Sequence, residues 1–236
     1  MGANAKPGAK SAAMPPNKAQ RRATRLLAER ARERQLQQRR RLRNGAIVAV
    51  ILIAIIGGLY AVFHKSEQSS ASGYEVGSPG PGQTAPGFSL ASSSGGTTSL
   101  ADARGKTVLL YFQEGLTCQP CWDQIRDLEK SSAQVKAAGI DEIISITTDP
   151  ADLIARKVKD DKLTTPVLSD PDLKVSKAYE ANQYGMMGDS RDGHSFVLVG
   201  PDGKIQWRAD YGGAPKYTMY VKVDKLLADL KAGRQS

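Results

Sequence analysis

Five short apolar runs recur along the C-terminal part of the chain, at residues 107–112, 143–147, 166–168, 194–199 and 205–211. Apolar runs of this length, bounded by turn residues, are typical of buried strands. The last two runs flank a Gly-Pro-Asp-Gly turn, which predicts that they pair antiparallel. Two further short runs, residues 88–91 and 97–100, enclose a Ser/Gly-rich loop and predict a small hairpin.

Helical patterns separate these runs. Apolar residues recur at helical spacing from Trp122 to Ala138, and Gly139 supplies a stop. Asp149-Pro150 and Asp170-Pro171 each predict a capped helix start, with the helices reaching about residues 159 and 179. An amphipathic pattern over residues 217–230 predicts the last helix. Strands that alternate with helices and end in a hairpin predict an α/β three-layer domain with a mixed central sheet.

A separate hydrophobic segment precedes this domain. Residues 46–63 contain no charged side chain, and eighteen residues are just long enough to cross about 30 Å of hydrocarbon as a helix. A cleaved signal peptide is the competing interpretation. The forty-five preceding residues exceed a normal signal n-region, and no small-residue cleavage site follows Phe63 at once. The pattern therefore favours an uncleaved transmembrane helix.

The charge of the chain is concentrated in front of that segment. Residues 1–43 carry thirteen Lys or Arg against Glu29 and Glu33, a net +11, and the remainder sums to −2. The positive-inside rule then places the N-terminus in the cytoplasm and the domain on the outer side of the cell membrane. The tail is expected to be partly helical and to lie against anionic lipid. The near-neutral domain lacks the basic, aromatic face of nucleic-acid readers, so we expect no nucleic-acid partner.

These patterns predict four segments. Residues 1–45 form a basic cytoplasmic tail, 46–63 a single transmembrane helix, 64–85 a flexible Ser/Gly/Pro linker, and 86–233 the folded domain.

The two cysteines of the chain carry its clearest chemistry. They stand three apart in Cys118-Gln119-Pro120-Cys121, directly after the predicted strand at 107–112. A cysteine at a helix N-terminus is favoured as a thiolate, so Cys118 is the expected attacking sulfur and Cys121 the resolving one. Pro120 is tolerated in a first helical turn. A purely structural disulfide over so short a loop stabilises little, and no second cysteine pair completes a zinc site.

Pro120 and four further residues are candidate modulators of this dithiol. Glu114 is a candidate proton acceptor for Cys121, or else a solvated loop residue. Trp122 is expected to cover the dithiol, with a docking surface as the alternative. His194 is expected to be a partly exposed residue at a strand end, or a modulator of the thiolate charge by proximity. Thr117 stands directly before the first cysteine.

The loop before His194 carries two more candidates. Met186-Met187 either lines a hydrophobic edge for substrate or fills irregular gaps, and Arg191 is within reach of a thiolate if the loop turns inward.

Several motifs resemble one known family. Residues 82–90 (GQTAPGFSL), 99–100, 105–106, 108–112 and 196–205 (FVLVGPDGKI) resemble the redoxin and alkyl hydroperoxide reductase/thiol-specific antioxidant (peroxiredoxin) family, over about residues 82–231. The resemblance implies a thioredoxin-like fold. It also implies redox chemistry without a cofactor or a resident metal, since the family includes membrane-anchored disulfide reductases as well as peroxidases.

The two activities require different patterns. The peroxidases resemble P-x-x-x-T-x-x-C, in which Cys121 takes the cysteine position while Cys118 stands at the threonine and Glu114 at the proline. Arg191 lies too far upstream for the arginine of that pattern, although a one-residue realignment recruits Thr117. The reductases resemble W-C-x-x-C with a later cis-proline. In that alignment Thr117 replaces the tryptophan and His194 the proline.

The sequence therefore predicts a membrane-tethered, extracytoplasmic thiol-disulfide oxidoreductase. Its expected partners are extracytoplasmic protein thiols or disulfides and a thiol electron donor of unknown identity. A thiol-dependent peroxidase is the alternative. A minor alternative is a Cu(I)-binding module that uses Cys118, Cys121 and His194.

Overall fold

The computed structural model describes residues 53–54, 56–57 and 73–234. The predicted tail, most of the predicted membrane span and residues 64–72 of the predicted linker lie outside these residues. Within the described ranges, no helix is both long enough and apolar enough to cross a bilayer.

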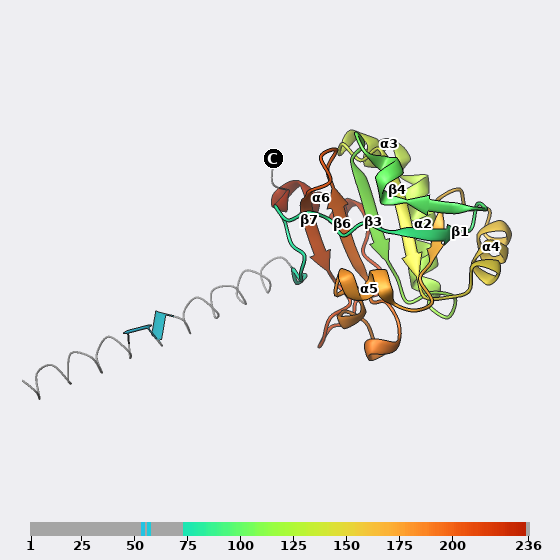
Figure 1. The fold of residues 1–236 in the computed structure, drawn as a ribbon. Helices are drawn as coiled ribbons and strands as arrows, with labels where there is room; N and C mark the ends of the chain where they lie inside the picture. Colours follow the sequence, from blue (N-terminus) through green and yellow to red (C-terminus); the bar gives the residue numbers. More distant parts are fainter. Residues whose placement is uncertain (1–52, 55, 58–72, 235–236) are drawn as a thin grey trace, which may run out of the picture. The chain divides into compact units, whose positions relative to one another are not determined.

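Seven strands in residues 73–234 form one mixed sheet with the order β2-β1-β5-β4-β3-β6-β7 (Figure 1). The central strands β3, β4 and β5 are parallel, whereas all other neighbouring pairs are antiparallel. The predicted hairpins and the three predicted central strands are confirmed. The bounds are β1 (Ser89–Ser92), β2 (Thr97–Ser99), β3 (Val108–Phe112), β4 (Glu142–Thr147), β5 (Val167–Ser169), β6 (Ser195–Val199) and β7 (Ile205–Asp210).

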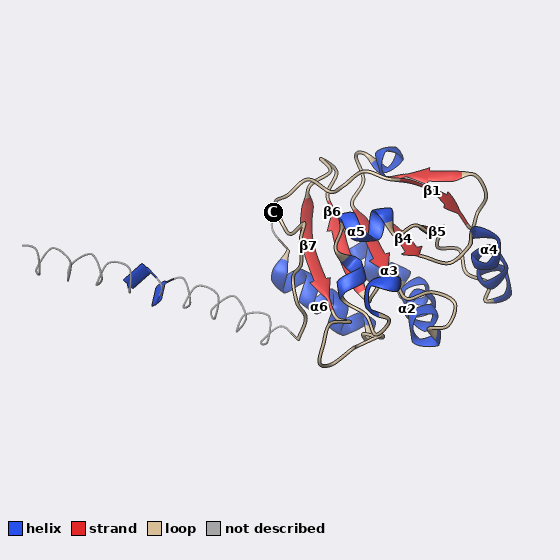
Figure 2. Cartoon of the chain, turned by 60° about the horizontal axis from the view of Figure 1, so that its bottom comes forward, coloured by secondary structure: helices blue, strands red, loops and turns tan. Residues whose placement is uncertain are grey.

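Helices cover both faces of this sheet (Figure 2). Side chains alternate along each strand, so Leu109 and Tyr111 of β3 join one hydrophobic cluster, whereas Leu110 and Phe112 join the other. The first cluster includes side chains of α2 (Gln119–Lys130), α3 (Ser132–Ala137), α4 (Ala151–Asp160) and α6 (Val223–Gly233); the second includes α5 (Lys174–Ala178) and the 3-10 helix η1 (Leu100–Ala103). The predicted three-layer α/β domain is confirmed.

One predicted helix is divided. Residues 122–138 were expected to form a single helix, but α2 ends at Lys130 and α3 begins at Ser132. Ser131 between them is the C-cap of α2 and the N-cap of α3. Ser131 and Ser132 are weak helix formers because their hydroxyls compete for backbone hydrogen bonds. The apolar spacing continues across the break, so periodicity alone does not reveal it.

The last helix starts later than expected. Helix α6 begins at Val223, not at residue 217, because tertiary contacts of the buried Met219 and Val221 hold residues 217–222 in an irregular conformation. Tyr217 has a φ of 46°, Met219 packs against both cysteines, and the amide of Val221 donates to the Gln124 side chain at 2.7 Å. This irregular segment is part of the site described below.

Residues 73–85 pack along the sheet although their composition predicts a flexible linker. Glu75 forms a β-bridge with Asp210 and Thr84 with Lys204, and the Tyr74 ring lies 5.3 Å from that of Tyr211. These contacts use the backbone of a Ser/Gly/Pro-rich stretch, which composition does not report. The packed part of the chain therefore includes residues 73–85, ahead of the predicted start at residue 86.

Candidate active site

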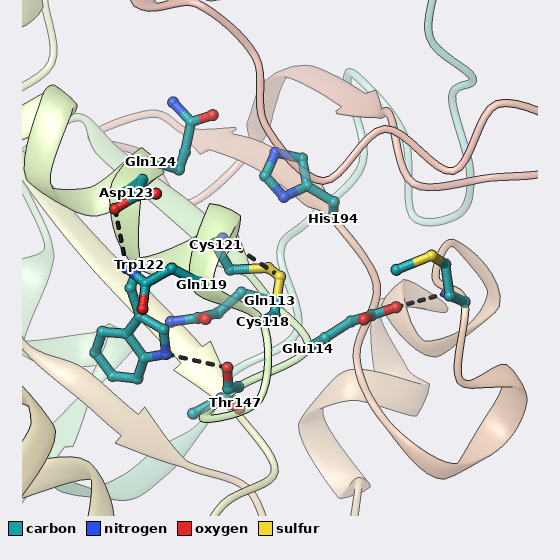
Figure 3. Close-up of a disulfide and its surroundings, with 12 residues drawn as sticks. Gln113, Glu114, Cys118, Gln119, Cys121, Trp122, Asp123, Gln124, Thr147 and His194 are labelled. Carbon is teal, nitrogen blue, oxygen red and sulfur yellow. Dashed lines mark hydrogen bonds between the residues drawn. A yellow bond between two sulfur atoms is a disulfide. The ribbon is translucent and has the colours of Figure 1, made fainter.

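The dithiol motif lies at the carboxyl end of β3, where the chain turns into α2. Cys118 is the N-cap of α2, and its sulfur accepts a hydrogen bond from the amide of Cys121 at 3.3 Å. The two cysteines are joined in a disulfide with a Cα–Cα distance of 5.3 Å (Figure 3). Pro120 stands in the first turn, where no intrahelical donor is lost. The local geometry predicted from the CxxC spacing is present.

The two sulfurs differ in access to solvent. Cys118 is 6% exposed, whereas Cys121 is 0% exposed. Met219 packs against both and forms a small buried cluster with them. Met219 was not predicted from the sequence, because a methionine 98 residues beyond Cys121 carries no local sign of its contact. Cys118 is therefore the outer sulfur of the pair and Cys121 the inner one.

The loop before Cys118 is fixed by Asp149. Its carboxylate accepts the amide of Leu116 at 2.7 Å and the hydroxyl of Thr147 at 3.3 Å. It also pairs with Arg191 at 3.0 Å, and Arg191 donates as well to the carbonyl of Glu114 at 3.0 Å. The expectation that Asp149 caps the following helix is wrong, because its carboxylate turns back to this loop and α4 has no side-chain cap.

A glycine makes that close approach possible. Gly115 has a φ of 95°, and a Cβ atom there would overlap the Asp149 carboxylate. Glycine adopts this left-handed conformation without a steric penalty. Arg191, a candidate to reach the thiolate, is instead engaged by Asp149 and by the Glu114 carbonyl.

Trp122 lies behind the disulfide and is 0% exposed. Its indole N–H donates to the carbonyl of Gly115 at 3.0 Å, and Lys157 Nζ lies 5.6 Å from its ring centroid. The indole therefore belongs to the core under α2, which leaves no docking surface on Trp122. Thr117 and Pro120 are exposed at the mouth of the motif.

Glu114 is buried but does not point at the dithiol. Its side chain extends away from the two sulfurs (Figure 3), and its Oε1 accepts the amide of Met186 at 2.5 Å. The residue is 4% exposed, so it is not a solvated loop residue. In this disulfide form its carboxylate fixes the neighbouring loop.

His194 is 0% exposed, whereas a partly exposed strand end was expected. Its Nδ1 lies 2.9 Å from the Tyr111 hydroxyl, which is also 3.4 Å from the carbonyl of Cys121. Burial lowers the pKa of His194 to about 3, and burial together with the charge of Glu114 raises the pKa of Tyr111 well above its ordinary value. His194 is therefore a neutral imidazole at physiological pH. It does not stabilise a thiolate by carrying charge.

Three further polar residues of the site were not found in the sequence: Tyr111, Asp149 and Gln124. In the sequence, Tyr111 is one more residue of an apolar strand pattern, and the Asp149-Pro150 pair indicates a helix cap. Gln124 is 0% exposed on α2, where its carbonyl accepts the amide of Val221 and fixes the segment that carries Met219. A polar residue on the buried face of an amphipathic helix was the available signal for Gln124.

The Cu(I) alternative requires three ligands to converge. Over the described ranges, no group of three or more His, Cys, Asp or Glu side chains is arranged to hold a metal ion. His194 Nδ1 is directed to Tyr111, and both sulfurs are bonded to each other.

Comparison with known proteins agrees with this geometry. The profile of the AhpC/TSA family matches residues 81–208. Peroxiredoxin Bcp of Escherichia coli K12 is 31% identical over 128 residues, which cover 53% of this chain and 81% of Bcp. Thiol-disulfide oxidoreductase ResA of Bacillus subtilis is 25% identical over 171 residues, which cover 72% of this chain and 85% of ResA.

The fold has solved counterparts. The crystal structure of peroxidoxin BcpB from Mycobacterium tuberculosis superposes with a TM-score of 0.55 and 19% identity, and the match covers 66% of this chain and 99% of BcpB. The likeness confirms the expected thioredoxin-like fold. With a family profile that spans more than half of its length, the chain belongs to the AhpC/TSA family of redox proteins.

Proposed function

We propose that this protein is a thiol-disulfide oxidoreductase whose Cys118–Cys121 pair exchanges disulfides with protein partners. The observation that carries the proposal is the unequal burial of two sulfurs one helical turn apart, 6% exposed at Cys118 and 0% at Cys121. Exchange requires an outer sulfur that a partner can reach and an inner sulfur that only the outer one meets. The arrangement satisfies both conditions.

The reduced protein acts in two steps. The Cys118 thiolate attacks one sulfur of a partner disulfide, so that a mixed disulfide forms and the other partner sulfur leaves as a thiolate. Cys121 then loses its proton and attacks the Cys118 sulfur, which closes the internal disulfide and expels the partner thiolate. Two electrons pass to the partner, and the reverse sequence oxidises a partner dithiol. The reduction potential of the pair relative to its partners sets the direction.

Local geometry supplies the activation of Cys118. As the N-cap of α2, its sulfur lies at the positive end of the helix dipole and accepts the Cys121 amide. Both effects favour the thiolate and lower the pKa of an N-terminal cysteine. The neutral His194 adds no charge, so the helix terminus supplies the main electrostatic stabilisation.

Trapping tests this assignment. With Cys121→Ser, the Cys118 thiolate still attacks but the mixed disulfide cannot resolve, and we expect partner-linked species that dithiothreitol releases. Cys118→Ser should trap far fewer partners because the remaining sulfur is enclosed. Equal trapping by both variants, or none by either, would refute the proposed roles.

A thiol-dependent peroxidase is the second candidate, and the 31% identity to peroxiredoxin Bcp favours it. In that reaction a thiolate attacks hydrogen peroxide and becomes a sulfenic acid while hydroxide leaves; the second cysteine then condenses with it, which releases water and forms the disulfide. Stopped-flow oxidation of the reduced protein by peroxide decides. A rate no higher than that of free cysteine removes this candidate.

We also propose that residues 46–63 anchor the protein in the cell membrane with the redox site on the outer side. The support is the eighteen-residue apolar segment behind a tail of net charge +11. Cys118 and Cys121 are the two cysteines of the chain, so a membrane-impermeant maleimide reports their side directly. After mild reduction, labelling in intact spheroplasts supports the proposal. Labelling only after lysis contradicts it.

A further inference from the structure

Two loops next to the disulfide expose large apolar side chains. Met186 is 57% exposed, Met187 51% and Tyr217 43%, and they account for most of the exposed large apolar side chains in residues 73–234. Folding normally removes such side chains from water, and an exposed apolar cluster marks a surface that another molecule covers. We call these three residues the apolar rim.

Both loops that carry the rim are tied to segments next to the cysteines. The loop of Met186 is held to the segment before Cys118 by the 2.5 Å hydrogen bond to Glu114. Tyr217 lies two residues before Met219, which packs against both cysteines. The two loops also meet each other, because Gly212 and Gly213 pack against Tyr184, two residues before Met186.

Two of the charged groups beside the rim are engaged within the protein. The Glu114 carboxylate accepts the Met186 amide, and Arg191 pairs with Asp149. Neither group is free to attract an acidic or basic ligand. Exposed Asp189 and Lys216 flank the rim with opposite charges, so the rim itself offers apolar side chains and favours an apolar occupant.

The occupant of the rim follows from the reaction, because Cys118 becomes covalently bonded to a partner sulfur. Residues that neighbour the partner's cysteine must then lie within a few ångströms of Cys118, since each residue of an extended chain advances about 3.3 Å. Flexible methionine side chains adapt to apolar groups of different shape, a property of surfaces that bind many sequences.

Resting on the thiol-disulfide exchange proposed above, we propose that the apolar rim binds apolar side chains next to the cysteine of an extended polypeptide. The preferred substrates are therefore disulfides in unfolded or exposed segments whose cysteines have apolar neighbours. Small hydrophilic disulfides react at Cys118 without use of the rim.

Two synthetic disulfide peptides test this preference. The peptides have equal length and charge. One carries Leu and Phe beside its cysteines, and the other carries Ser and Gly there. The rate of each peptide with dithiothreitol is measured as well, to correct for its intrinsic reactivity. We expect the reduced full-length protein to react about tenfold faster, in kcat/KM, with the apolar peptide, which is the effect of burying one or two apolar side chains.

Variants locate the preference. Met186→Ser/Met187→Ser/Tyr217→Ser should reduce the ratio between the peptides to about twofold or less. Leu153→Ser, which removes a 38% exposed leucine from α4, should leave it unchanged. Oxidised glutathione should react at the same rate with all three proteins.

The outcomes separate the two proposals. Equal corrected rates for the peptides with the wild-type protein would refute the rim without any variant, as would an unchanged ratio in the triple variant. In either case, a normal reaction with oxidised glutathione leaves the exchange function in place. If neither peptides nor glutathione react with the reduced wild-type protein, the exchange function itself fails.

Discussion

The two sides of the disulfide are built in different ways. On the helix side, the Cys118 amide donates to Gly115, the Cys121 amide to Cys118, and the Trp122 indole to Gly115, all within seven residues of sequence. The opposite side consists of residues 184–194 and 212–221. Many of its contacts join residues far apart in sequence: Met186 and Glu114 are 72 positions apart, and Val221 and Gln124 are 97 apart.

The difference separates activation from access. Local helix geometry places Cys118 at an N-terminus, where we expect the helix dipole to favour its thiolate. Long-range packing of Met219, His194 and the two loops decides what reaches the sulfur. Substitutions on the loop side should therefore change selectivity and stability more than thiolate character, and substitutions at the helix terminus should do the reverse.

Gly115→Ala should have the largest effect on stability, because it disrupts the contact with Asp149 that joins the two sides. We expect a loss of about 3–5 kcal/mol in the free energy of unfolding, because the new Cβ is strained at positive φ and overlaps the Asp149 carboxylate. Gly95→Ala is the matched control, with a φ of 93° and open space around it, and should cost about 1 kcal/mol. Urea denaturation measures both. Equal losses would mean that the Asp149 contact contributes nothing.

Asp149→Ala removes the carboxylate that holds the helix side to the loop side. The Leu116 amide and Arg191 lose their partner, and we expect a loss of about 2–4 kcal/mol together with slower exchange. The control is Asp152→Ala, which breaks an exposed ion pair with Arg156 four residues later in α4 and should change stability little. If the two variants unfold at the same urea concentration, the loop is fixed by other contacts.

The same division explains what could be predicted from the sequence. The strands, the two-sided sheet and the placement of Cys118 follow from patterns within a few residues: apolar run, CxxC spacing and Pro120 in the first turn. The break at Ser131 was missed because apolar periodicity continues through it. Helix α6 starts late because tertiary contacts of residues 217–222 override their amphipathic pattern.

The wall that faces the dithiol was the least predictable part of the site. His194 was expected near the surface because it stands next to a strand end, yet the rings of Tyr111, Phe196 and Tyr211 surround it. Asp149 was assigned to a helix cap because the Asp-Pro pattern is identical whether the carboxylate turns forward or back. A residue's neighbours in sequence do not report partners that lie more than thirty positions away.

Acid should destabilise the loop side through His194. Its folded pKa of about 3 lies below its ordinary value of 6.5, so between these values the unfolded chain binds a proton that the folded protein does not. Stability therefore falls as the pH falls below 6.5, by about 2–3 kcal/mol down to pH 4.5. His194→Phe lacks the titrating group, so between pH 6.5 and pH 4.5 its free energy of unfolding should fall by about 2–3 kcal/mol less than that of the wild type. Parallel pH profiles would contradict the burial of a neutral imidazole.

Asp192, two residues before His194, should change the pH dependence of stability in the opposite direction. Burial, with a further contribution from Asp170, raises its pKa well above the ordinary value of 3.8. The folded protein thus keeps a proton that the unfolded chain has released, and stability falls as the pH rises above 3.8. Asp192→Asn should gain stability relative to the wild type as the pH rises from 4 toward 7. A constant difference between the two proteins would show that Asp192 is ionised in the fold.

The smallest expected effect is that of Tyr111→Phe, which removes the hydroxyl between His194 and the Cys121 carbonyl. The loss of these two buried hydrogen bonds should cost about 1–2 kcal/mol in urea denaturation. Tyr220→Phe removes a half-buried hydroxyl that donates to Asp127 at 2.7 Å and serves as the control. Because the Tyr111 hydroxyl bonds to the Cys121 carbonyl and to the His194 ring rather than to Cys118, trapping of partners by Cys118 should be unchanged, whereas release of the mixed disulfide should slow. Slower trapping with unchanged release would place Tyr111 in the activation of Cys118 and contradict the division between the two sides.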